Sequence, residues 1–193
     1  TKCLLEKLLS MFMKKKKNLL IVGKKSFIAQ NLHKDLKKKN TEVISVSFEF
    51  FSKNYRSLIS NTDVIINCTS NKNFVSNKYQ SKNDHDLFIA NKISKFNIKL
   101  ILFSTRKVYR LKFNIEENYI KEPKCNYSKN KLISENAVKK IMKDKLLILR
   151  IVNIIGFPIF NKRKLHNTFI DIFFDKIKTG FIYDSRGIYK DFT

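Results

Sequence analysis

Five short apolar runs, separated by longer stretches with helical periodicity, constrain the fold of this chain more than any other feature. The runs are rich in Ile, Leu and Val: NLLIVG (18–23), EVISVSF (42–48), DVIINC (63–68), KLILFS (99–104) and KLLILRIV (145–152). Their apolar character is continuous rather than alternating, which is typical of strands buried on both faces of a sheet. The sequence therefore predicts a sheet that is covered by helices on both sides.

Helical patterns fill the segments between the runs. In the first of these, SFIAQNLHKDLKKK, Ile28, Leu32 and Leu36 are four residues apart and share one helical face. Further helices are expected in DLFIANKISKF (86–96) and in SKNKLISENAVKKIMK (128–143). Strands that alternate with helices predict an α/β fold with a doubly wound parallel sheet of the Rossmann type. Such sheets bind ligands at the carboxyl ends of their strands, near the topological switch point.

The composition fits one domain of ordinary size in a reducing compartment. The chain has 193 residues, of which 43% are hydrophobic, and no apolar run reaches the length of about 18 residues that a membrane span needs. The three cysteines, Cys3, Cys68 and Cys125, are odd in number and far apart, so we expect free thiols and a cytoplasmic location. The three histidines have no metal-ligand spacing, and no metal is expected.

A net charge of +24 invites a nucleic-acid interpretation. The lysines are spread along the whole chain, and the sequence contains no recognition module, zinc pattern or aromatic ladder. Specific nucleic-acid binding is therefore disfavoured. Non-specific attraction to polyanions or to a phosphate-bearing substrate stays open.

Both ends of the chain indicate a fragment of a longer protein. The chain starts on Thr1, whereas MKKKKNLLIVG from Met13 would be a natural beginning for a domain, and it stops at YKDFT without a cap. We expect an N-terminal extension at 1–12, a dinucleotide-binding domain at 13–156 and the start of a second lobe at 157–193.

The first strand runs into GKKSFIA (23–29), a motif with the spacing G-x-x-G-x-x-G in which Ser26 and Ala29 take the second and third glycine places. Such a turn lets the backbone approach a pyrophosphate at a helix N-terminus. An acidic residue is expected at the end of the second strand to hold the ribose, but Ser47 stands there, with Glu49 two residues on. NAD and NADP both stay open, as does a strand–turn–helix without a ligand.

A phenol and an ammonium group lie four residues apart in NYSKNKLISE (126–135), so Tyr127 and Lys131 share one helical face. A cation at about 4 Å, in an effective dielectric near 20, is worth about 4 kcal/mol, enough to move a phenol towards the pKa that acid–base catalysis needs. The alternative is a surface pair in a lysine-rich helix. In STRKVYR (104–110), Thr105 ends the fourth strand and either faces the ligand crevice or caps a loop.

The order of these motifs resembles the extended short-chain dehydrogenase/reductase family, the NAD-dependent epimerase/dehydratase group. That family reads T-G-x-x-G-F-I-G, N-A-A, S-S-x-x-V-Y-G, P-x-x-x-Y-x-x-S-K-x-x-x-E and L-R-x-x-N-x-x-G-P. The corresponding segments are GKKSFIA, DVIINCTS, STRKVY, PKCNYSKNKLISE and LRIVNIIGFP, at fitting intervals along residues 18 to 193. Each motif is weak by itself, but five in this order are specific.

The resemblance implies a role for particular residues. Thr105 would bind the substrate oxygen, Tyr127 would be the acid–base, and Lys131 would hold the ribose and lower the tyrosine pKa. Asn153 would lie towards the sugar nucleotide. The implied cofactor-binding set is Gly23, Ser26, Phe27, Ile28, Ser47, Asn67, Cys68, Thr69, Tyr127 and Lys131.

The resemblance implies an NAD(P)-dependent epimerase, dehydratase or 4-keto reductase that acts on a nucleotide-activated sugar, and a homodimer is compatible with it. The departures from the family pattern are Ser26 and Ala29 in glycine places, Arg110 after V-Y, and Cys68 and Thr69 in alanine places. The family usually continues for another hundred or so residues, so the second lobe would be truncated, and both an active chain and an inactive fragment stay open. The alternative is a non-catalytic NAD(P)-binding or polyanion-binding protein that retains the fold.

Overall fold

The computed structural model describes residues 18–37, 42–112 and 114–152 of the chain. The chain divides into two compact units, Thr1–Val152 and Asn153–Thr193, and the described residues all belong to the first. The expected extension at 1–12, the substrate lobe at 157–193 and the predicted substrate-binding residue Asn153 therefore lie outside the described residues.

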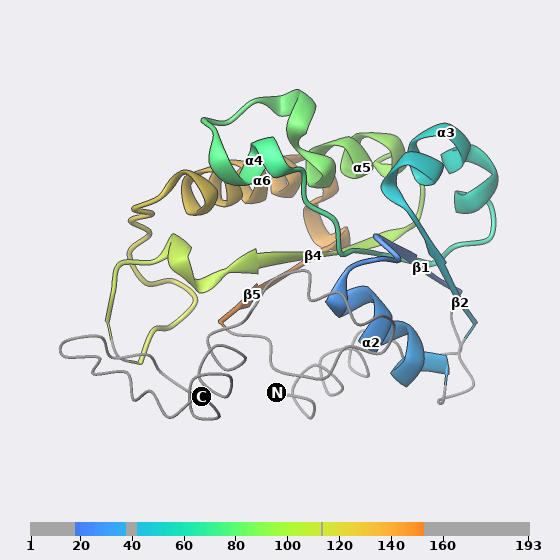
Figure 1. Ribbon diagram of the computed structural model, residues 1–193, viewed down its shortest axis with the longest axis horizontal. Helices are drawn as coiled ribbons and strands as arrows, with labels where there is room; N and C mark the ends of the chain where they lie inside the picture. The colour runs from blue at the N-terminus through green and yellow to red at the C-terminus, as the bar shows by residue number, and fades with distance from the viewer. Residues whose placement is uncertain (1–17, 38–41, 113, 153–193) are drawn as a thin grey trace, which may run out of the picture. The chain divides into compact units, whose positions relative to one another are not determined.

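Five parallel strands form a single sheet in the order β2-β1-β3-β4-β5 (Figure 1). Leu20 of β1 pairs with Ile44 of β2 on one side and with Ile65 of β3 on the other. The chain passes from β1 out to β2 and then crosses back to β3, so the switch point lies between β1 and β3. The predicted doubly wound parallel sheet is confirmed. Its strands are β1 (Leu19–Val22), β2 (Val43–Val46), β3 (Val64–Asn67), β4 (Lys99–Thr105) and β5 (Leu146–Ile151).

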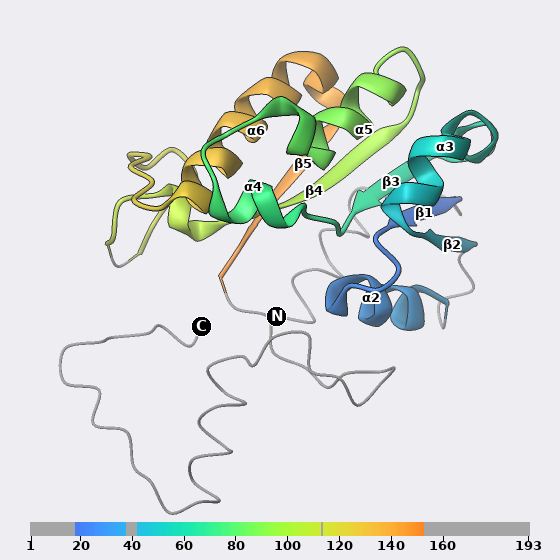
Figure 2. The same ribbon diagram turned by 45° about the horizontal axis from the view of Figure 1, so that its top comes forward.

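Helices cover both faces of the sheet. One face carries α2, and the other carries α3, α5 and α6 (Figures 1 and 2). Among the helices of the described segments, none is both long enough and apolar enough to cross a membrane. The helices are α2 (Phe27–Lys37), α3 (Phe48–Ile59), α4 (Lys72–Ser76), α5 (His85–Ile93) and α6 (Asn126–Met142), with short 3-10 turns η1 (Ser81–Asn83), η2 (Arg106–Val108) and η3 (Lys143–Lys145).

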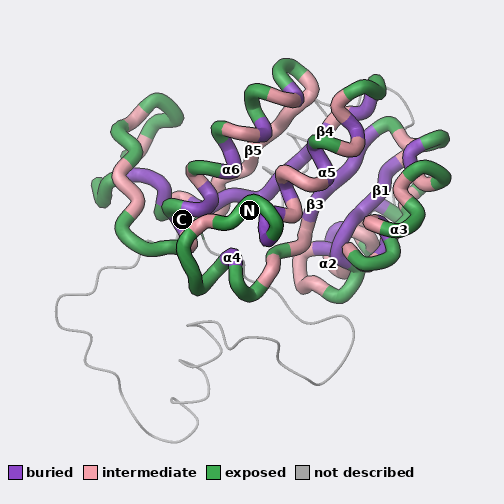
Figure 3. The backbone as a smooth tube through the Cα atoms, turned by 90° about the horizontal axis from the view of Figure 1, so that it is seen from above, coloured by how far each residue is buried: buried purple, intermediate pink, exposed green. Residues whose placement is uncertain are grey.

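The hydrophobic core consists of two layers, one on each face of the sheet. Successive strand residues point to opposite faces, so Leu20 and Ile65 pack under α3, α5 and α6, whereas Ile21 and Ile66 pack against α2. The central strands form the most deeply buried part of the backbone in Figure 3. Each such side chain contributes about 1.5–3 kcal/mol by its burial. A continuous apolar run is therefore what a strand covered on both faces requires.

The structure corrects the prediction for residues 42–48. The strand β2 ends at Val46, and Ser47 is the N-cap of α3, because its Oγ accepts a hydrogen bond from the Phe50 amide at 3.2 Å. Phe51 then enters the core. The run FEFF favours a strand by its aromatic content, but a serine cap followed by an acidic first turn starts a helix. The helix α3 was not predicted at all, and α6 begins two residues earlier than predicted.

Candidate functional site

The turn after β1 is shaped by hydrogen bonds that fix both of its ends. The amides of Gly23 and Lys24 donate to the Val46 carbonyl oxygen at 2.7 and 3.0 Å, which ties the turn to β2. Ser26 donates its amide to the Gly23 oxygen at 2.8 Å and caps α2, because its Oγ accepts from the Ala29 amide at 3.1 Å. The serine in the second glycine place is therefore a helix cap.

Gly23 has a φ of +108°, a conformation that an L side chain rarely adopts. A Cβ at this position would lie 2.7 Å from Thr69 Cγ2 and 3.0 Å from the carbonyl carbon and oxygen of Cys68. The turn after β1 thus packs directly against the loop after β3, on the two sides of the switch point. Glycine is required here by the chain's own packing, and the approach of a pyrophosphate stays a prediction.

The first turn of α2 leaves backbone donors open. Within the described segments, the amides of Phe27 and Ile28 have no hydrogen-bond partner, and the first turn contains no acidic residue. Lys24 and Lys25 precede the helix. Open amides, the positive end of the helix dipole and two nearby cations together favour an anion at this end of the sheet.

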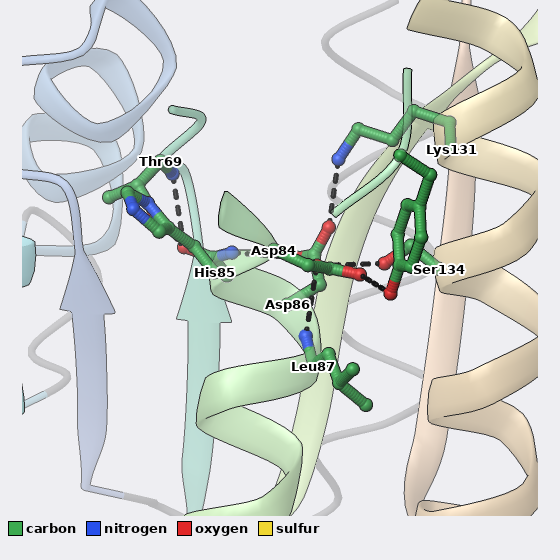
Figure 4. A network of polar contacts seen from close by, with 9 residues as sticks. Thr69, Asp84, His85, Asp86, Leu87, Lys131 and Ser134 are labelled. Atoms are coloured by element: carbon green, nitrogen blue, oxygen red, sulfur yellow. Dashed lines mark hydrogen bonds and ion pairs between the residues drawn. The ribbon is translucent and has the colours of Figure 1, made fainter. Parts of the chain in front are cut away.

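A polar network follows the end of β3 (Figure 4). The buried Asn67 donates from Nδ2 to Asp86 Oδ1 at 2.6 Å and accepts at Oδ1 from the amide and the hydroxyl of Thr69, at 3.0 and 2.8 Å. His85 Nδ1 lies 2.9 Å from Thr69 Oγ1, and its ring stacks on Phe48 with centroids 3.5 Å apart. The family that the sequence resembles has alanine at the position of Thr69. Here the Thr69 hydroxyl connects Asn67 to His85.

Cys68, the other departure from the family alanines, lies beside the β1 turn. Burial raises the pKa of its thiol well above the ordinary range, against a smaller opposing effect of the Ser26 hydroxyl. The thiol is therefore neutral near pH 7 and acts as a small packing group between the two loops.

The predicted acid–base pair lies in the first two turns of α6. Tyr127 is half-buried, and Lys131, one turn further on, is buried with a side-chain exposure of 6%. Its Nζ donates to Asp86 Oδ2 at 2.8 Å and lies 5.5 Å from the centroid of the Phe74 ring. The Tyr127 phenol is close enough to interact electrostatically with the ammonium group. Lys131 is therefore not a solvated surface residue.

Thr105 ends β4 and is buried, and its Oγ1 accepts a hydrogen bond from the Lys107 amide at 3.2 Å. The capping alternative is thus realised, and among the described residues the hydroxyl has no acceptor for its own proton, which a ligand oxygen could take up. The neighbouring Ser104 Oγ is buried, and it has no hydrogen-bond partner among the described residues. Because α6 packs against both β4 and η2, Thr105 and the first turns of α6 come from adjoining elements.

The described residues also include Ser47 of the predicted site and two aspartates that were not predicted to belong to it. Ser47 directly follows β2, and its hydroxyl caps α3. Arg110, in a family glycine place, forms an ion pair with Glu122 at 2.7 Å on the surface. Asp84 and Asp86 were missed, although D-H-D at the start of an apolar helical pattern is an N-cap signal.

A second, part-buried ion pair joins α6 to β5. Arg150 donates from Nη2 to Glu135 Oε2 at 2.6 Å and from Nη1 to the Tyr109 hydroxyl, and its guanidinium lies over the Tyr109 ring. Glu135 is 2% exposed. The sequence contained both residues in the K-x-x-x-E and L-R motifs but did not reveal that they pair.

Solved structures share the fold. A dTDP-4-dehydrorhamnose reductase from Yersinia enterocolitica matches with a TM-score of 0.67 and 20% identity, over 86% of this chain and 61% of its own. A UDP-N-acetylglucosamine 4-epimerase from Methanobrevibacter ruminantium matches with a TM-score of 0.68 and 17% identity, over 86% and 64%. A UDP-glucuronic acid 4-epimerase from Bacillus cereus in complex with NAD gives 0.62 and 15%, over 84% and 63%.

These likenesses establish the fold, and the chain spans less than two thirds of each of the three structures. No protein-family model matches the sequence. No curated protein sequence matches it either.

Proposed function

We propose that this chain is the NAD(P)-binding part of an extended short-chain dehydrogenase/reductase that acts on a nucleotide-activated sugar. The reaction would be an epimerisation, a dehydration or a 4-keto reduction. The observation that carries this proposal is the buried Lys131 ammonium one turn from the half-buried Tyr127 phenol, at the start of a helix that packs on β4. The fold likeness to nucleotide-sugar reductases and epimerases supports the same class.

The dinucleotide would lie across the carboxyl ends of β1 and β3. Its pyrophosphate would meet the open amides of Phe27 and Ile28, with the Gly23 turn held against the Cys68–Thr69 loop beneath it. The close packing of these two loops requires glycine at position 23, and glycine has no side chain that would obstruct an approaching phosphate. These residues fit a dinucleotide, and the nicotinamide of a bound dinucleotide would supply the hydride acceptor or donor.

The chain's own residues would handle the proton. Tyr127 would exchange its phenolic proton with the sugar hydroxyl or ketone, and Thr105 would donate a hydrogen bond to the same oxygen. One Lys131 N–H is committed to Asp86, and no other hydrogen bond of this ammonium is present among the described residues. Its remaining donors could hold ribose hydroxyls.

Titration of the 193-residue chain with NAD⁺ and with NADP⁺, followed by calorimetry, tests the binding step. The chain should bind at least one of them. Lys131→Met should weaken binding by roughly 10- to 100-fold, the worth of a charged hydrogen bond, whereas Tyr127→Phe should bind nearly as wild type. Lys140→Met removes the same charge from the exposed face of α6 and is the matched control.

If the folded wild-type chain bound neither NAD⁺ nor NADP⁺, the proposed dinucleotide binding would be wrong. The rival is a polyanion-binding protein that retains the fold, which the net charge of +24 favours. Equal losses in Lys131→Met and Lys140→Met would point to that rival, because a general charge effect does not depend on which face of α6 carries the lysine.

A further inference from the structure

The Lys131 ammonium has a buried counter-ion that the sequence motifs do not contain. Lys131 Nζ and Asp86 Oδ2 are 2.8 Å apart, and the two side chains are 6% and 4% exposed. Removing one partner of such a pair leaves a charge that water cannot reach, so the surviving group loses its charge more easily. Asp86 lies 45 positions before Lys131, near the start of α5.

The second carboxylate oxygen of Asp86 is fixed by a directed chain of donors. The Thr69 amide can only donate, so the Asn67 atom that faces it is Oδ1, and Asn67 Nδ2 therefore points to Asp86. The Thr69 hydroxyl also donates to Asn67 Oδ1, and its oxygen must accept from His85 Nδ1–H. Every hydrogen-bond donor in this series points towards Asp86, and the series therefore fixes the orientation of the Asp86 carboxylate.

Several titratable groups face Lys131. Burial by itself would lower the pKa of the ammonium, but the Asp86 carboxylate, with smaller effects of Tyr127 and Asp84, outweighs it and holds that pKa above its usual value. His85 also faces it, and burial lowers the His85 pKa, so this imidazole is neutral near pH 7. The other titratable groups close to Asp86 are the buried thiol of Cys68 and the phenol of Tyr79.

We propose that Asp86 is the positioning residue for Lys131: its carboxylate, oriented through Asn67, Thr69 and His85, holds the ammonium charged and in place before a dinucleotide binds. This inference rests on the proposed function, because the ligand that the ammonium receives is the ribose of NAD(P). It assigns Asp86 an effect through Lys131 rather than a contact with substrate. A purely structural Asp86 would stabilise the fold without setting the charge of Lys131.

The test is Asp86→Asn, which keeps the size of the side chain and an oxygen for Asn67. The variant chain, in parallel with wild type, is titrated with NADP⁺ and with NAD⁺ from pH 6.5 to 9.5. Without its counter-ion, the buried ammonium should lose its proton at a lower pH. The affinity of the variant should then fall with rising pH by up to about tenfold for each unit above the lowered pKa, while that of wild type stays nearly level.

Asp84→Asn is the matched control. Asp84 is equally buried on the same helix, but it accepts from Tyr79, Ser134 and the Leu87 amide rather than from Lys131. Its variant should keep a nearly level pH profile even if it unfolds more easily. A fall with pH of the same size in both variants would overturn the proposal, and so would a level profile in Asp86→Asn.

A measurement on the ligand-free chain separates this inference from the proposed function. The rate of acetylation of the Lys131 amine by trace acetic anhydride, followed across pH by mass spectrometry, reports its protonation without any dinucleotide. In wild type the amine should stay protonated beyond the ordinary lysine range, and in Asp86→Asn it should react at lower pH. This result would stand even if neither dinucleotide bound. A wild-type Lys131 that titrates below the ordinary lysine range would overturn the inference, even if Asp86→Asn failed to fold.

Discussion

Gly23→Ala tests whether the two loops at the switch point are packed as described. The added Cβ would lie 2.7 Å from Thr69 Cγ2 and 3.0 Å from the Cys68 carbonyl, on a residue whose φ is +108°. A positive φ costs an L residue about 1–2 kcal/mol, and overpacking costs about 1–3 kcal/mol, so the free energy of unfolding should fall by about 2–5 kcal/mol. A loss of this size is a large part of the free energy of unfolding of a typical domain, which is about 5–15 kcal/mol.

Urea unfolding followed by circular dichroism measures this loss as a lower midpoint with an unchanged slope. Thr69→Ser removes the nearest methyl group and keeps the hydroxyl that bonds Asn67 and His85. In the double variant, Gly23→Ala should therefore cost about 1 kcal/mol less than in the wild-type background. A free energy of unfolding for Gly23→Ala within about 0.5 kcal/mol of wild type, the usual range of a surface change, would contradict this packing of the two loops.

The remaining predictions concern catalysis, the second ion pair and the net charge. In a homologue-length protein that contains this chain, Tyr127→Phe should keep the fold and reduce turnover by about 10²–10⁴, the usual share of an acid–base group, as measured by steady-state kinetics. Arg150→Met should lower the free energy of unfolding by about 3–5 kcal/mol in a urea titration, because it leaves the buried Glu135 carboxylate without its partner, and Glu135→Gln should cost less. Binding to mixed DNA or RNA, followed by fluorescence anisotropy, should be weak and vanish by roughly 200 mM salt, and tight, sequence-selective binding at that salt would contradict this view of the charge.

A change at Gly23 is a poor probe of the cofactor by itself. The position is expected to approach a pyrophosphate, but its first contact in the structure is the loop after β3. A Gly23 variant that fails to bind a dinucleotide would therefore not separate a lost ligand contact from a displaced loop. Lys131→Met with its exposed control at Lys140 is the better probe of the ligand, because neither side chain belongs to the turn.

Local pattern was sufficient for much of the fold. Apolar runs rich in Ile, Leu and Val predicted all five strands, and this pattern is clearest in β1 and β3, whose residues are all buried. The helix α3 was the exception, because the aromatic run after Ser47 fits a strand as well as a helix. The start of α3 depends on whether the Ser47 hydroxyl caps the first helical turn, and a single serine in a sequence is not a sufficient signal of a cap.

The sequence by itself determined that Tyr127 and Lys131 share a helical face, because four residues are about one turn of any α-helix. Only the tertiary structure decided that Lys131 is buried, and that its counter-ion is Asp86. Spacing along one helix is a property of local backbone geometry. The partner of a buried charge depends on which strands lie side by side. The strands β3, β4 and β5 are neighbours in the sheet, so the helices that connect them, α5 and α6, lie against each other on one face.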